Sequence, residues 1–124
     1  MDTSIKILIV DDFATMRRIL KNILKQLGFK NIMEADDGTT ALDVLEKNDI
    51  DLIISDWNMP KMTGLDLLKK VRAHEKYAKH PFLMVTAEAQ KQNVIEAVQA
   101  GVSNYVVKPF TAEAISEKLK KIIK

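Results

Sequence analysis

Hydrophobic residues along this chain fall into two kinds of pattern that alternate from one end to the other. Short and nearly continuous apolar runs occupy five segments, namely residues 5–10, 32–35, 52–55, 82–86 and 105–107, the second being the weakest. Runs of this length, rich in β-branched residues, are typical of parallel strands that are covered on both faces. We therefore predict five parallel strands.

Between these runs the apolar residues recur with the spacing of an α-helix. The longest pattern follows the positions i, i+3, i+4, i+7, i+8 and i+11 and comprises Met16, Ile19, Leu20, Ile23, Leu24 and Leu27. It predicts an amphipathic helix, and Gly28 follows where a left-handed C-terminal cap is expected. Shorter patterns predict a helix over residues 39–46, one marked by Leu65, Leu68 and Val71, one marked by Val94, Ala97 and Val98, and a last one marked by Ile115, Leu119, Ile122 and Ile123.

The alternation of strands and helices indicates an α/β fold in which right-handed crossovers build a parallel sheet with helices on both faces. Five such units within 124 residues fit the flavodoxin-like strand order 2-1-3-4-5. Residues 1–124 are expected to form a single domain, because a chain of this length suits one core rather than two.

Composition narrows the range of partners. The formal net charge of +2, from 19 basic and 17 acidic residues, is too small and too scattered to indicate nucleic-acid binding. The chain has no cysteine, no run that resembles a signal peptide, and none near the ~20 apolar residues of a membrane span. We expect a cytoplasmic monomer that binds neither nucleic acid nor membranes.

Polar residues follow four of the five predicted strands. Asp11 and Asp12 come after the first strand, Asp56 after the third, Thr86 at the end of the fourth and Lys108 after the fifth. All strands of a parallel sheet end on the same edge, and ligands bind beyond that edge where the strand order reverses. These side chains are therefore expected to converge on one small cleft.

The combination of side chains predicts phosphoryl chemistry. Three neighbouring carboxylates repel one another, and Mg²⁺, which prefers oxygen ligands, would remove that conflict. An ammonium and a hydroxyl on the other side would hold phosphoryl oxygens, and a carboxylate can attack phosphorus to form an aspartyl phosphate. Asp56 is the natural nucleophile because it lies between the acidic pair and Lys108.

Each of these residues taken alone has a plainer interpretation. Asp11 or Asp12 could cap the first helix, and Asp56 could be a turn residue. Thr86 could be an ordinary strand residue and Lys108 a surface lysine. Only their joint placement at the ends of different strands favours a site.

Other classes of site find less support in the sequence. The first strand–helix turn has no glycine, so it lacks the dinucleotide-binding pattern, and no P-loop pattern occurs. His74 and His80 are expected on the surface away from the predicted cleft. No Ser–His–Asp arrangement is indicated.

The set of motifs resembles the two-component receiver domains, or response regulators, over residues 5–124. The motifs that carry this resemblance are DD after the first strand, D with MP and G after the third, TA after the fourth and KP after the fifth. The resemblance implies that Asp56 is the phosphoacceptor and that Mg²⁺ is held by Asp11, Asp12, Asp56 and the backbone carbonyl of Asn58. It also implies that Thr86 and Lys108 contact the phosphoryl group.

Within that family, the stretches DDFATMRRI, SDWNMP, MVTAEA and NYVVKPFT are most similar to the single-domain chemotaxis regulators of the CheY type. Trp57, Asn58 and Glu88 are typical of that group, and Asn58 and Glu88 are implied to tune the lifetime of the phosphoryl group. For the Lys108–Pro109 peptide bond, base rates favour trans, whereas the resemblance favours cis.

The expected output is a change in protein binding, because the chain ends with its last predicted helix and leaves no room for a DNA-binding domain. The resemblance implies that Thr86 swings toward the phosphoryl group and that Tyr105 turns inward into the freed space. The partners implied are the histidine kinase CheA, the flagellar switch protein FliM and a phosphatase such as CheZ. The candidate partner surface comprises Ala89, Lys91, Val94, Tyr105, Val107, Phe110, Thr111, Ala112 and Lys118.

Three alternatives to this function stay open. The chain could be a receiver of another two-component pathway, a Mg²⁺-dependent phosphatase working through an aspartyl phosphate, or a receiver-like scaffold. The phosphatase is disfavoured because such enzymes often place a second Asp two residues after the nucleophile, where this chain has Asn58, and because no cap insertion is visible. The complete set of site residues counts against the scaffold.

Overall fold

The computed structural model describes residues 2–87 and 91–123. Its sheet is built from five parallel strands in the order β2-β1-β3-β4-β5, with bounds β1 (Lys6–Val10), β2 (Asn31–Ala35), β3 (Leu52–Asp56), β4 (Phe82–Thr86) and β5 (Asn104–Val107). The predicted α/β fold and strand order are therefore confirmed. Strand β2 lies at one edge of the sheet and is mostly exposed, which explains its weak apolar pattern.

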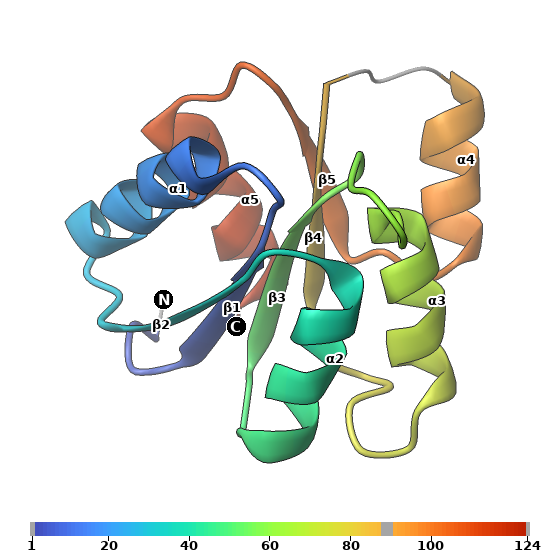
Figure 1. Cartoon of the computed structure of the whole chain (residues 1–124). Coiled ribbons are helices and arrows are strands. Elements are labelled where there is room, and N and C mark those ends of the chain that lie inside the picture. The colour runs from blue at the N-terminus through green and yellow to red at the C-terminus, as the bar shows by residue number, and fades with distance from the viewer. Residues whose placement is uncertain (1, 88–90, 124) are drawn as a thin grey trace.

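Within the described residues, four helices connect the strands and a fifth follows β5, namely α1 (Ala14–Gln26), α2 (Gly38–Lys47), α3 (Gly64–Ala73), α4 (Lys91–Gln99) and α5 (Ala112–Ile122). Helices α1 and α5 cover one face of the sheet, and α2, α3 and α4 cover the other (Figure 1). Three of them begin at a side-chain cap: Asp37, Thr63 and Thr111 accept the backbone N–H three residues further on. None of the helices within 2–87 and 91–123 is long and apolar enough to cross a membrane.

The apolar strands divide their side chains between two cores. In β1, Ile7 and Ile9 pack against residues of α1 and α5, whereas Leu8 and Val10 pack against residues of α2 and α3. All four are completely buried. A strand buried on both faces has no polar alternation, which is why these segments are continuous apolar runs in the sequence.

Gly28 ends α1 in the left-handed conformation, as predicted, with φ of 104°. Its N–H donates to the carbonyl of Lys25, and the N–H of Phe29 donates to the carbonyl of Leu24. These bonds satisfy the free carbonyls of the last helical turn and direct the chain toward β2.

Two residues predicted to face the core are exposed instead. Ile19 on α1 is 42% exposed and Val98 on α4 is 61% exposed. The buried stripe of α1 is centred on Leu20 and Leu24, and Ile19 lies about 100° around the helix from Leu20, beyond its edge. On α4 it is Ala97 that is buried, and Val98 lies the same angle away from it.

Candidate acidic site at the carboxyl edge of the sheet

Three carboxylates meet at the carboxyl edge of the sheet. Asp11 follows β1 and Asp56 ends the neighbouring strand β3, and the two positions are level because Val10 pairs with Ser55. One carboxylate oxygen each from Asp11, Asp12 and Asp56 lies within 4.8 Å of the others. Asp11 and Asp56 are buried, whereas Asp12 is exposed. Such a cluster concentrates negative charge where little water can screen it.

Lys108 brings the counter-charge into this cluster. Its Nζ lies 2.9 Å from Asp56 Oδ1 and 3.8 Å from Asp11 Oδ2. The backbone holds the residue in place, because its N–H donates to the carbonyl of Thr86 at 2.7 Å. The Lys108–Pro109 peptide bond is cis, as the family resemblance favoured.

Neither Asp11 nor Asp12 caps the first helix. The N-cap of α1 is Phe13, which makes no side-chain capping bond. Instead, Asp11 Oδ1 accepts the N–H of Phe13 at 2.9 Å and the Asp11 N–H donates to the carbonyl of Ala35 at 3.1 Å. The capping interpretation is therefore wrong. Asp11 and Asp12, which we call the acidic turn, connect β1 to α1 without capping the helix.

The second oxygen of Asp11 has an unusual environment. Asp11 Oδ2 is buried and accepts no hydrogen bond within the described part of the chain. Burial, reinforced by the nearby Asp56 and Asp12 carboxylates, raises the pKa of Asp11 to about 6, although the Phe13 N–H and Lys108 act in the opposite direction. A buried oxygen with no donor among these residues, beside two other carboxylates, is suited to a cation ligand.

The donor set fits Mg²⁺. Oxygens that bind one Mg²⁺ at ~2.1 Å lie up to about 4.2 Å apart, so the three carboxylates need only a small side-chain movement to share an ion. Asn58 is exposed in the loop after β3, and the role of its backbone carbonyl stays a prediction.

Thr86 and Tyr105 lie beside a small cavity next to this site. Both line it together with Trp57, Met84 and three residues of α4. Thr86 is buried at the end of β4, and Tyr105 is half-buried on β5 with Lys118 Nζ 5.4 Å from the centre of its ring. The predicted movements of Thr86 and Tyr105 stay predictions.

The candidate partner surface is described in part. Glu88 and Ala89 lie outside the described residues, as does the side chain of Lys91. Thr111 is exposed and caps α5 through its hydroxyl. The half-buried members are Val94, Tyr105, Val107, Phe110, Ala112 and Lys118.

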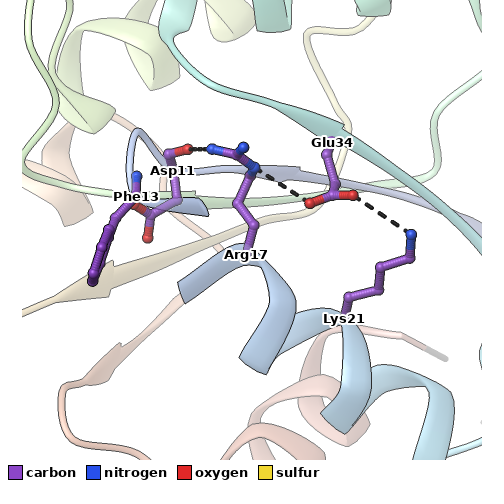
Figure 2. Close-up of polar contacts among 5 residues, drawn as sticks. All are labelled: Asp11, Phe13, Arg17, Lys21 and Glu34. Atoms are coloured by element: carbon purple, nitrogen blue, oxygen red, sulfur yellow. Dashed lines mark hydrogen bonds and ion pairs between the residues drawn. The ribbon is translucent and has the colours of Figure 1, made fainter. Parts of the chain in front are cut away.

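Sequence reasoning missed the role of Arg17 at the acidic turn, and it gave Gly64 only as a motif residue without its contact to the backbone after β3. The guanidinium of Arg17 donates from Nη1 to the backbone carbonyl of Asp11 (Figure 2). Gly64, at the start of α3, donates its N–H to the carbonyl of Trp57 at 2.9 Å. The sequence does contain one indication that this part of α1 has a specific role. Arg17 and Arg18 place positive charge in the first half of the helix, where the helix dipole disfavours it.

In the absence of metal, Asp11→Asn is expected to stabilise the protein at neutral pH. A pKa raised from the usual 3.8 to about 6 means that the folded state binds the proton more tightly than the unfolded state does. Stability contributed by this group is therefore greatest below pH 4 and is lost as the pH rises toward 6, a difference of roughly 3 kcal/mol. The free energies of unfolding of the variant and the unaltered chain can be measured by urea unfolding in EDTA at pH 4 and pH 7.5.

The asparagine oxygen can keep the bond from the Phe13 N–H, so the fold of the variant is retained. The gain in unfolding free energy of Asp11→Asn over the unaltered chain should grow with pH between about 4 and 6 and then level off. An equal gain at both pH values would show that burial of the Asp11 charge is not the cause.

Comparisons with known proteins identify the family of this chain. The family model of the response regulator receiver domain matches residues 7–120. Chemotaxis protein CheY of Pseudomonas aeruginosa is 62% identical over 117 residues, and chemotaxis protein CheY-3 of Vibrio cholerae serotype O1 is 59% identical over 122 residues. These matches cover 94% and 98% of this chain respectively, and 94% of each relative.

A similar solved structure agrees with this placement. The chemotaxis protein CheY4 of Vibrio cholerae, crystallised at low pH, is 35% identical and superposes with a TM-score of 0.91 over 97% of this chain and 99% of that one. The agreement covers the sheet and helices that bring the three acidic side chains together. The chain belongs to the response regulator receiver domain family and, within it, to the CheY-like chemotaxis regulators.

Proposed function

We propose that this chain accepts a phosphoryl group on Asp56 from a histidine kinase in a Mg²⁺-dependent reaction. The observation that carries the proposal is the contact between Asp56 Oδ1 and Lys108 Nζ within a cluster of three carboxylates. The phosphorylated form then signals by binding a flagellar motor switch protein. In support, the relatives at about 60% identity are named chemotaxis proteins.

In the transfer step, a carboxylate oxygen of Asp56 forms a bond to phosphorus while the bond from phosphorus to the donor's leaving group breaks. Asp11 and Asp12, with Asp56 and the carbonyl of Asn58, would hold Mg²⁺, which offsets the negative charge of the phosphoryl oxygens when bound. Lys108 supplies a fixed cation to the same oxygens. The hydroxyl of Thr86 serves as a further donor on the opposite side.

The signal would leave the site through Thr86 and Tyr105, which share a cavity with Trp57 and residues of α4. A phosphoryl group adds charge and acceptor oxygens at Asp56, toward which Thr86 turns. Tyr105 then occupies the freed space and changes the surface formed by α4, β5 and α5. CheA as the kinase, FliM as the switch protein and CheZ as a phosphatase are the proposed partners of a monomeric, cytoplasmic protein, with Asn58 and Glu88 tuning the phosphoryl lifetime.

Trp57 provides the test, since it is the only tryptophan and directly follows Asp56. We expect its fluorescence to change when Mg²⁺ is added, and to change again with a small phosphodonor such as acetyl phosphate. Mass spectrometry of peptides from the treated protein should then locate the phosphoryl group on Asp56. A pull-down of the motor switch protein with and without a phosphate mimic would check the output surface.

A different pattern would favour the enzyme alternative. Sustained release of phosphate from many phosphate esters, without a stable signal from Trp57, would indicate turnover of external substrates. A Mg²⁺ affinity that does not fall on acidification would contradict carboxylate ligation, because protons compete with the metal for these oxygens.

A further inference from the structure

We propose that Arg17 is a positioning residue that fixes the Asp11 carboxylate for metal binding. The inference rests on the proposed Mg²⁺ site and adds to it a residue that does not itself touch the metal. Arg17 acts on the site through the backbone of Asp11, to which its guanidinium donates (Figure 2).

The hydrogen bonds of Asp11 leave one of its oxygens without a donor. Its N–H donates to the carbonyl of Ala35, and its Oδ1 accepts the N–H of Phe13. Its carbonyl accepts from Arg17 Nη1. Only Oδ2, the oxygen beside Asp56 and Lys108, accepts no hydrogen bond from the described residues. The bond from Arg17 is the one member of this set in which a side chain other than that of Asp11 takes part, so it can be removed by substitution without changing Asp11.

Arg17 is itself held in place from a neighbouring strand. Its Nε lies 3.3 Å from Glu34 Oε1 on β2, and the other oxygen of Glu34 lies 3.5 Å from Lys21 Nζ. The side chain of Arg17 is only 19% exposed. Its planar guanidinium thus joins the end of β1 to the end of β2, with two donors at fixed angles. A lysine, with a single flexible ammonium, cannot reproduce both contacts.

If Arg17 acted only through its charge, it would weaken Mg²⁺ binding rather than support it. A cation next to a site for a divalent cation repels the metal, so removing it should strengthen Mg²⁺ binding if Coulomb interactions were its only influence. Its place in the first half of α1 is also unfavourable for a positive charge. A positioning role predicts weaker binding on removal, so the two explanations differ in sign.

The test compares Mg²⁺ affinity in Arg17→Gln, Arg17→Lys and Arg18→Gln with that of the unaltered chain, using calorimetry and Trp57 fluorescence. We expect about a tenfold loss of affinity in both Arg17 variants, the size typical of groups that orient metal ligands. Arg18 is the matched control, because it is the next residue, is exposed, and makes no hydrogen bond or ion pair with residues 2–87 and 91–123. Its variant should bind Mg²⁺ as the unaltered chain does, or slightly more tightly.

Unfolding in EDTA should be measured for each variant, since a merely structural role would lower stability and leave the Mg²⁺ affinity of the folded protein unchanged. That result, or tighter binding by Arg17→Gln, would overturn the inference. An unchanged Mg²⁺ affinity in Arg17→Lys would also overturn the inference, because a positive charge at this position would then be enough to maintain Mg²⁺ binding. If the unaltered chain bound no Mg²⁺, the proposed metal site would fall together with this inference.

Discussion

Asp56→Asn is expected to abolish every change in Trp57 fluorescence that a phosphodonor causes in the presence of Mg²⁺. Asp56 is buried at the end of β3, and its Oδ1 is the carboxylate oxygen nearest to Lys108, at 2.9 Å. An uncharged amide is a poor nucleophile toward phosphorus, so no phosphoryl group should be transferred. The fold should persist, because one of three mutually repelling charges is removed.

The matched control is Asp49→Asn, the same chemical change in an exposed residue near the start of β3, at the opposite edge of the sheet. It should leave both fluorescence changes intact. Phosphorylation of Asp56→Asn at the exposed Asp12 would show that any carboxylate of the cluster can accept the group. That outcome would contradict a specific role for the pairing of Asp56 with Lys108.

The meeting of the acidic residues could be predicted because strand topology leaves little choice. Once β1 and β3 are parallel neighbours, residues that follow a paired position by the same number of residues lie side by side. Val10 pairs with Ser55, and the next residues are Asp11 and Asp56. Lys108 is placed by the same principle, since its N–H continues the ladder from β5 to the carbonyl of Thr86. Neither placement depends on side-chain detail.

Side-chain contacts between elements could not be predicted in the same way. Whether Arg17 reaches the carbonyl of Asp11 depends on the angle at which α1 leaves the acidic turn. The exposure of Ile19 and Val98 depends likewise on the rotation of α1 and α4 against the sheet. Helical periodicity identifies an apolar stripe and does not fix which edge of it faces solvent.

The acidic cluster stays together in the fold because its backbone is held independently of its charges. The N–H and carbonyl of Asp11 are engaged by Ala35 and Arg17, and the backbone after Asp56 is engaged by Gly64 through Trp57. Repulsion among the carboxylates is therefore retained as a cost to stability rather than relieved by moving apart. A cation that binds the cluster should offset this cost and stabilise the folded state by an amount that grows with the logarithm of the ratio of its concentration to its Kd.

Gly64→Ala is expected to lower the free energy of unfolding by about 2 to 3 kcal/mol. A Cβ at this position would lie 2.3 Å from the carbonyl oxygen of Asp56, 2.8 Å from Met84 Sδ and 3.0 Å from the Cα of Trp57. The first of these atoms is backbone in a buried strand and cannot move aside. Thermal unfolding should show a melting temperature lower by roughly 8 °C. Displacement of β3 should also reduce Mg²⁺ affinity, which the Trp57 signal reports.

Gly38→Ala is the matched control, because Gly38 is likewise a buried first residue of a helix. There the added Cβ would lie 2.5 Å from Sδ, 2.8 Å from Cγ and 2.9 Å from Cβ of Met62, a half-buried residue of the loop before α3. Another rotamer of Met62 moves Sδ and Cγ away, and its Cβ must shift slightly with the loop. The control should therefore cost less than Gly64→Ala, about 1 kcal/mol, because a loop gives way rather than a buried strand, and the smaller entropy of the unfolded chain offsets part of that cost. Equal losses of unfolding free energy in the two variants would mean that helix α3 can move away from β3. The contact between Gly64 and Asp56 would then not set the position of the phosphoacceptor strand.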